Sequence, residues 1–126
     1  MISMKSDKPF SMSARGQSFK YAFEGILSFF KSQPNAFIHL LFTVVVFVAI
    51  LFLNVSIHEI IILVLAIGFV WVAEIFNTVI ESIMDHVSPA QHPSVKYIKD
   101  VSAAAVLVAA ITAAIAGLLV FIPKFF

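Results

Sequence analysis

Residues 71–85 read WVAEIFNTVIESIMD and continue an apolar run that begins at Ile60. Two glutamates, an asparagine and an aspartate therefore stand in a segment otherwise suited to lipid. A carboxylate in or near a bilayer is energetically expensive and is by default a functional-site hypothesis. The polar residues share one stripe of a helix because their spacing is i, i+4, i+7 and i+11, with an asparagine beside them. They are Glu74, Thr78, Glu81, Asp85 and Asn77. Such a stripe needs partners: a cation, a polar substrate or another helix.

The composition is that of a membrane protein. Of the 126 residues, 61% are hydrophobic and 12% are charged, whereas soluble domains carry about 25% charged residues. The mean hydropathy is +1.05. The net charge of +1 gives no indication of nucleic-acid binding. Because cysteine is absent from the sequence, disulfides and thiolate metal sites are excluded.

Three stretches without Lys, Arg, Asp or Glu predict three membrane spans; they are residues 36–58, 60–73 and 101–123. A span needs about 20 apolar residues, and the second stretch reaches that length only by including Glu74. We expect transmembrane helices over residues 36–53, 57–84 and 97–122. Alanine pairs in the third would let another helix approach closely. Two prolines, Pro89 and Pro93, indicate a loop between the second and third spans.

The N-terminal part is expected to differ from the spans. Residues 1–14 are predicted to be disordered, and their scattered charges without an early apolar core argue against a signal peptide. Residues 15–32 predict an amphipathic helix with aromatic side chains on one side. It suits the plane of the membrane interface, although packing on its own protein is an alternative. The expected fold is all-α, with this surface helix and three transmembrane helices in one domain, residues 15–126.

Basic residues predict the orientation. Those before the first span are Lys5, Lys8, Arg15, Lys20 and Lys31, and those after the second include Lys96 and Lys99. The positive-inside rule then places the N-terminus and the 86–99 loop in the cytoplasm. Counted from the outer end of the second span, Glu74 lies roughly 25 Å across a core about 30 Å thick. The stripe is therefore expected to cross the cytoplasmic boundary of an inner (cytoplasmic) membrane.

Residue types at this boundary suit a Mg²⁺–phosphate site. Mg²⁺ prefers hard oxygen ligands and substrate phosphates, and lysine can bind phosphate as a point charge. The four glycines are isolated, so no phosphate-cradling loop is present. From residue types alone, a kinase ranks no higher than a transporter. Lys99 and Asp100 are also typical of a helix-end charge pair. His39 and His58 are expected to serve helix packing or the interface, and Trp71 is expected to pack against its neighbours.

Two stretches resemble the signature of the small prokaryotic diacylglycerol kinases. Residues 74–85 read EIFNTVIESIMD, and residues 92–106 read HPSVKYIKDVSAAAV. The His92-Pro93 pair and residues 19–26, FKYAFEGI, are similar to the undecaprenol kinase branch of that family. The resemblance covers residues 15–123.

The resemblance implies a homotrimeric membrane kinase that transfers the γ-phosphoryl group of Mg-ATP to a lipid hydroxyl. Its active sites would lie between subunits at the cytoplasmic face, with undecaprenol as the lipid and diacylglycerol as the alternative. It implies that Glu74 is the general base, Asn77 its helper and Glu81 a metal ligand, and that Glu74 and Ala103 contact the lipid. The ATP contacts it implies are Tyr21, Gln33, Glu81, Ala90, Gln91, His92, Lys99 and Asp100.

The sequence departs from the family pattern at two positions. Gln33 stands where the family usually has a second metal-binding glutamate, and Phe37 stands where it has a basic residue. Gln33 can still offer an amide oxygen to a metal, but it lacks the charge that offsets Mg²⁺. We expect weaker metal binding or a different nucleotide arrangement, in an enzyme that still works; an inactive relative is the extreme alternative.

Two readings of other classes are a small ion conductor and a non-catalytic membrane partner. Between Ser102 and Pro123 the third span offers Thr112 as its polar residue. A conducting path would need polar groups through the full membrane thickness, which disfavours the conductor.

Overall fold

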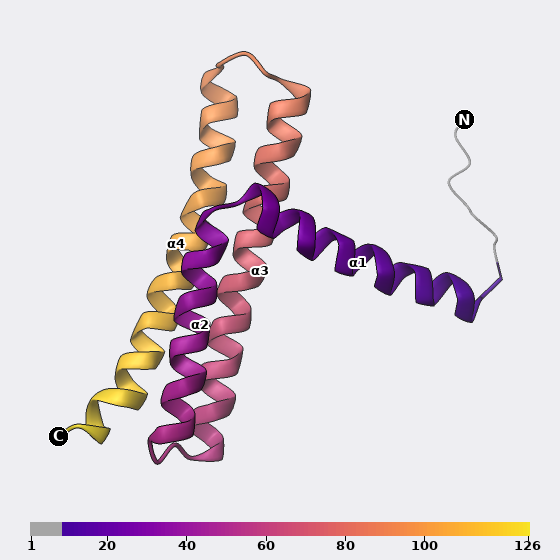
Figure 1. The fold of residues 1–126 in the computed structure, drawn as a ribbon. Coiled ribbons are helices and arrows are strands. Elements are labelled where there is room, and N and C mark those ends of the chain that lie inside the picture. Colours follow the sequence, from indigo (N-terminus) through magenta and orange to yellow (C-terminus); the bar gives the residue numbers. More distant parts are fainter. Residues whose placement is uncertain (1–8) are drawn as a thin grey trace.

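The computed structural model describes residues 9–126, which form four α-helices and one short 3₁₀ helix (Figure 1). They are α1 (Met12–Ser32), α2 (Asn35–Phe52), α3 (Ile57–Val87), α4 (Pro93–Phe121) and η1 (Ile122–Lys124). Three segments are long and apolar enough to cross a membrane: Asn35–Phe52, Ile57–Val87 and Pro93–Lys124. The predicted all-α class is confirmed, and the three predicted spans correspond to helices with the length and apolar composition that a span requires.

Two helices begin about one turn earlier than the sequence predicted, because side chains cap them. The Ser11 hydroxyl accepts the Ala14 N–H at 3.3 Å, so α1 begins at Met12 and includes residues that were expected to be disordered. The rest of that disorder prediction falls largely on residues 1–8, outside the described part. His92 Nδ1 accepts the Ser94 N–H at 3.1 Å, and α4 begins at Pro93 rather than at residue 97.

The three long helices form a thin bundle from which α1 projects (Figure 1). In Figure 1, α4 packs along α3, and α2 packs on α3 near the opposite end from the α3–α4 loop. Few side chains are buried within the chain, among them Leu63 and Val70 of α3 and Ala109 of α4. Ala109 is 0% exposed, because a methyl group lets the α4 backbone approach α3 closely. Most of the apolar surface of the bundle is therefore left for lipid or for other helices.

The helices differ in length, and this sets the shape of the molecule. The 18 residues of α2 span about 27 Å, whereas the 31 residues of α3 span about 46 Å. α3 and α4 consequently continue past the junction of α1 and α2 and end in the loop at the top of Figure 1. We call residues 78–101 the projecting hairpin. It extends roughly 15 Å beyond the junction.

The other end of the bundle is closed by polar contacts. Ser56 and Glu59 form a capping box at the start of α3, in which the side chain of each bonds the backbone N–H of the other. Lys124 Nζ donates to the Asn54 carbonyl at 2.8 Å and lies 3.0 Å from Glu59 Oε2. The C-terminal end of the chain is thereby tied to the turn between α2 and α3.

Candidate active site at the helix junction

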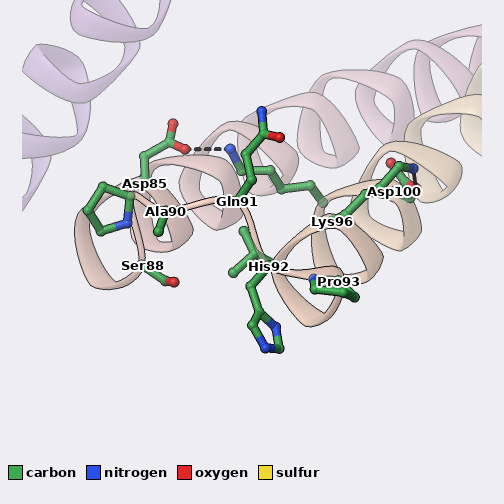
Figure 2. Close-up of a pocket in the computed structure, with 11 residues that line it drawn as sticks. Asp85, Ser88, Ala90, Gln91, His92, Pro93, Lys96 and Asp100 are labelled. Atoms are coloured by element: carbon green, nitrogen blue, oxygen red, sulfur yellow. Dashed lines mark hydrogen bonds and ion pairs between the residues drawn. The ribbon is translucent and has the colours of Figure 1, made fainter.

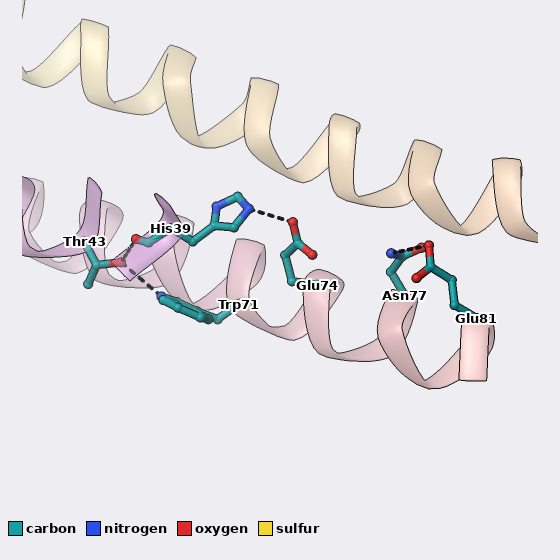
Figure 3. Close-up of polar contacts among 6 residues, drawn as sticks. All are labelled: His39, Thr43, Trp71, Glu74, Asn77 and Glu81. Carbon is teal, nitrogen blue, oxygen red and sulfur yellow. Dashed lines mark hydrogen bonds and ion pairs between the residues drawn. The ribbon is translucent and has the colours of Figure 1, made fainter. Parts of the chain in front are cut away.

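Glu74 lies on α3, and its partner is His39 of α2 (Figure 3). Because His39 is one turn from the start of α2, Glu74 lies close to the level at which α1 joins α2. His39 Nε2 and Glu74 Oε1 are 2.6 Å apart. Only 23% of the His39 side chain and 15% of the Glu74 side chain are exposed, so the contact is shielded within a single chain. The polar partner that the stripe requires at this position is another helix.

Trp71 lies one turn before Glu74 and joins α2 to α3. Its indole N–H donates to the Thr43 hydroxyl at 3.0 Å, and that hydroxyl donates to the His39 carbonyl at 2.8 Å. Two phenylalanines at the end of α1 pack on the indole, with ring centroids 6.3 Å (Phe29) and 5.5 Å (Phe30) away. Trp71 therefore packs against its neighbours as expected, and it also makes a hydrogen bond that the sequence did not reveal.

Asn77 connects α3 to α4 and to Glu81. Its Oδ1 accepts the Ser102 hydroxyl at 2.6 Å, and its Nδ2 donates to Glu81 Oε1 at 3.3 Å. Ser102 is 7% exposed, and among residues 9–126 it is the one polar residue that is buried. His39, Glu74, Asn77, Glu81 and Ser102 are from here called the junction cluster. Asn77 and Glu81 are fixed relative to each other, and this leaves the second Glu81 oxygen available to a cation or a donor.

A pocket of about 610 Å³ lies at the tip of the projecting hairpin (Figure 2). Its charged lining residues form two ion pairs, Lys99 with Asp85 and Lys96 with Asp100. The reading of Lys99 and Asp100 as a pair with each other is therefore wrong: neighbours in sequence point to different partners on a helix. The two lysines that line this pocket could receive phosphate groups if their carboxylate partners gave way.

Five of the residues that the resemblance assigned to ATP line this pocket: Ala90, Gln91, His92, Lys99 and Asp100. Tyr21, Gln33 and Glu81 are not among its lining residues. Tyr21 is exposed on α1, and Ala103 is exposed on α4. Within residues 9–126, no group of three or more His, Asp or Glu side chains that could hold a metal comes together. A single chain thus brings only part of the expected site together.

The two departures from the family pattern lie where α1 meets α2. Gln33 is the C-cap of α1: its N–H donates the last helical hydrogen bond, to the Phe29 carbonyl at 3.0 Å, and its own backbone is extended. The Phe37 ring packs on Phe30, with 5.8 Å between centroids. An aromatic contact between α1 and α2 thus occupies the position at which a basic side chain was expected.

An apolar groove of about 600 Å³ runs between α2 and α4, with α3 as its floor. Its α4 wall consists largely of small residues, including Ala110, Ala113, Ala114 and Gly117, and its polar end is formed by His39, Thr43 and Trp71. The groove therefore leads from the membrane interior towards the residue that contacts Glu74.

Two members of the junction cluster were not assigned a chemical role from the sequence. His39 was expected to pack or to lie at the interface. Ser102 was considered only as the polar residue that precedes the apolar part of the third span. A signal for His39 was available: it lies four residues after Asn35, one turn into a span that follows the Gln33-Pro34 break. No local sequence pattern indicates which residue of α4 faces Asn77.

A family model described as prokaryotic diacylglycerol kinase matches residues 20–121. The chain belongs to the prokaryotic diacylglycerol kinase family. Members of this family are ATP-dependent lipid kinases, so the chain is a membrane enzyme of lipid metabolism that phosphorylates a lipid. The expected family and enzyme class are confirmed. The family match therefore argues against the two alternative hypotheses, a small ion conductor and a non-catalytic membrane partner.

Two relatives represent the two lipid specificities considered from the sequence. The chain is similar to undecaprenol kinase of Bacillus subtilis, with 35% identity over 108 residues, covering 86% of this chain and 88% of that protein. It is also similar to diacylglycerol kinase of Synechocystis sp., with 38% identity over 101 residues, covering 79% of this chain and 58% of that protein. Identities this close to each other do not separate the two lipids.

Proposed function

We propose that this membrane lipid kinase transfers the γ-phosphoryl group of ATP to undecaprenol, with Glu74 as general base. The observation that carries the assignment is the place of Glu74. It is a shielded carboxylate on a membrane-spanning helix, and its partner His39 lies one turn from the start of α2, close to where the amphipathic α1 joins that helix. An amphipathic helix lies in the interface plane. A base at that level can meet a lipid hydroxyl from the membrane and a phosphate from the water.

The other members of the junction cluster suit phosphoryl transfer, which depends mostly on positioning and charge neutralisation. Asn77 orients Glu81 through its amide N–H. Mg²⁺ is usually bound by one or two carboxylates together with substrate phosphates. Glu81, assisted by the Gln33 amide oxygen, fits such a phosphate-delivered ion, which would offset charge on the transferred group. One carboxylate per chain is a sparse ligand set, in keeping with the weaker metal binding expected from Gln33.

ATP is proposed to bind at the projecting hairpin, with Lys99 on its phosphates and the loop from Ala90 to His92 near the nucleoside. Tyr21 and Gln33 do not line this pocket in a single chain. We therefore propose that a neighbouring copy supplies them, in a homotrimer whose active sites lie between subunits. The basic N-terminal residues and the hairpin would face the cytoplasm by the positive-inside rule.

Undecaprenol is favoured over diacylglycerol by two kinds of observation. The match to the undecaprenol kinase extends over nearly the whole of both chains, whereas the match to the diacylglycerol kinase covers 58% of that protein. His92-Pro93 and residues 19–26 also resemble the undecaprenol kinase branch. In the structure His92 caps α4, so this motif shapes the wall of the hairpin pocket.

The test is ATP-dependent lipid labelling by the purified protein in detergent micelles, with undecaprenol and diacylglycerol offered separately and together. We expect Mg²⁺-dependent labelling of undecaprenol with a kcat/KM at least about tenfold above that for diacylglycerol, which corresponds to roughly 1.4 kcal/mol. Preference for diacylglycerol would overturn the choice of lipid. Wild-type labelling by Glu74→Gln would overturn the assignment of the base, since a general base contributes about 10²- to 10⁴-fold.

A further inference from the structure

Within residues 9–126, the side chain of Glu74 makes one hydrogen bond, and its partner is His39. The two groups come from different helices, 35 residues apart in sequence, so the contact depends on the tertiary fold and not on a local turn. Both side chains are mostly shielded. A shielded carboxylate with a single fixed partner has fewer available rotamers than an exposed one, and its partner decides which oxygen is free.

Both the backbone and the ring of His39 have fixed neighbours (Figure 3). Its backbone carbonyl accepts the Thr43 hydroxyl, and the same hydroxyl accepts the Trp71 indole N–H. The imidazole also stands edge-on to the indole, with ring centroids 6.1 Å apart and an interplanar angle of 66°. Trp71 lies three residues before Glu74 on α3, so the helix that carries the carboxylate also orients its partner.

The chemistry of the two groups fixes the direction of their hydrogen bond. A general base has to be ionised, and an ionised carboxylate only accepts hydrogen bonds; in that form of Glu74, Nε2 of His39 carries a proton and donates a hydrogen bond to Oε1. Oε1 is then occupied, and Oε2 is left to meet a substrate hydroxyl.

Resting on the proposed role of Glu74 as base, we propose that His39 is a positioning residue that directs Glu74 Oε2 towards the lipid hydroxyl. In the step it serves, the lipid oxygen forms a bond to the γ-phosphorus and the bond from that phosphorus to the β,γ-bridging oxygen breaks, releasing ADP. The hydroxyl proton passes to Oε2 of Glu74. His39 keeps its own proton on Nε2 throughout, so it contributes geometry and does not exchange a proton.

The proposal is tested with three variants of the full-length protein in micelles. His39→Phe keeps a planar ring against Trp71 but removes the donor, and His39→Gln restores an N–H donor of similar reach. His58→Phe, at the far end of the bundle, is the matched control because that histidine is exposed and remote from Glu74. We expect His39→Phe to lower kcat about 10- to 100-fold, the order expected when a reacting group is misplaced by an ångström or less. KM for ATP and for lipid should change less than about twofold, since only transition-state geometry is affected.

The outcomes separate this proposal from the assignment of the base. Recovery of kcat by His39→Gln to within about fivefold of wild type would support positioning through a donated hydrogen bond. If Glu74→Gln is inactive but His39→Phe has wild-type kcat, Glu74 remains the base and the positioning role is overturned. If Glu74→Gln is active, the proposed base itself fails. Equal losses in His39→Phe and His39→Gln would also overturn the proposal, because a donor would then not be what the position requires.

A spectroscopic measurement gives a readout that does not depend on turnover or on a reduced amount of folded protein. In ¹⁵N-histidine-labelled protein, His39 Nε2 should resonate as a protonated, hydrogen-bonded nitrogen. Glu74→Gln should shift that resonance and leave the one from His58 unchanged. An unprotonated Nε2 in the wild-type protein would contradict the proposed direction of the hydrogen bond.

Discussion

The Ser102 hydroxyl donates a 2.6 Å hydrogen bond to Oδ1 of Asn77 and thereby fixes, from α4, the amide that holds Glu81 on α3. Ser102 is buried, so the contact is protected from water. A buried hydrogen bond contributes about 1 kcal/mol to stability, and its loss also frees the group it oriented. The serine therefore links the packing of α3 and α4 to the geometry of the proposed site.

Replacement of Ser102 by alanine should lower the free energy of unfolding by about 1 kcal/mol. It should lower kcat about tenfold, because the Asn77 amide can then turn away from Glu81. Reversible unfolding in micelles and steady-state lipid labelling measure the two effects. Thr112→Ala is the control on the same helix, since the Thr112 hydroxyl donates only to the Val108 carbonyl of α4 itself and makes no contact with α3 through that bond. A Ser102→Ala enzyme with wild-type kcat would dissociate this contact from catalysis.

The Trp71–Thr43 hydrogen bond should show coupling in a double-mutant cycle. Trp71→Phe keeps an aromatic ring against Phe30 but removes the N–H donor, and Thr43→Val removes the acceptor with little change of shape. Each should cost about 0.5–1.5 kcal/mol of unfolding free energy. The double variant should cost clearly less than the sum, because both changes remove one interaction. Strict additivity would mean that the bond contributes nothing beyond packing.

Lys99 is held by Asp85, so its use by ATP should depend on release from that partner. Lys99→Met should raise KM for ATP about tenfold, since a hydrogen bond to a charged group contributes roughly 1.5–3 kcal/mol. Asp85→Asn should leave that KM unchanged or lower it, because the lysine becomes available. Lys96→Met is the control within the same pocket: this lysine is exposed, and its loss should change KM by less than about twofold. An Asp85→Asn enzyme as impaired as Lys99→Met would show that the ion pair itself is required.

Gln33→Glu should raise the apparent Mg²⁺ affinity by about fivefold or more, because a unit charge near 4 Å adds roughly 1 kcal/mol even in a watery site. Activity measured against free Mg²⁺ at fixed ATP reports the change. Asn35→Asp introduces the same charge two residues away, at an exposed position, and should have little effect. An unchanged metal dependence in Gln33→Glu would place position 33 outside the metal's ligand set.

Lys124→Met should lower the thermal unfolding midpoint by a few degrees, because it removes two contacts between η1 and the α2–α3 turn. Glu59 would keep its capping contacts with Ser56. Lys20→Met is the matched control: its pair with Glu24 is exposed and 3.9 Å long, and pairs of that kind contribute little. Equal midpoints for the two variants would show that the Lys124 contact is also dispensable.

Much of this arrangement follows from the order of residues along the chain. Charge-free stretches predict three spans, and each corresponds to a helix long and apolar enough to cross a membrane. The spacing from Glu74 to Asp85 predicts that carboxylates follow one helix, and all of these residues lie on α3. Helix ends were less predictable, because the caps at Ser11 and His92 let α1 begin at Met12 and α4 at Pro93, about one turn before the predicted starts. A single capping hydrogen bond is a local detail that average hydropathy does not register.

The partners of the polar stripe were the least predictable part. The spacing indicated that partners were needed, but His39 and Ser102 reach α3 from helices distant in sequence, and the rotation of a packed helix is set by the whole interface. Lys99 and Asp100 illustrate the same limit, since each is paired with a residue other than its neighbour. The assignments of Glu74, Asn77 and Glu81 to catalysis remain predictions for the kinetic experiments.

The short α2 also gives the molecule a relation to the thickness of its membrane. At about 27 Å, α2 is slightly shorter than a typical hydrocarbon core, and it is the span that α1 joins directly. A thicker bilayer would have to thin locally around α2 or change the helix tilts, at a fraction of a kcal/mol for each ångström of mismatch. Because His39 lies one turn into α2, the same adjustment would act on the depth of Glu74. The length of one helix thus couples the acyl chains of the surrounding lipids to the position of the carboxylate.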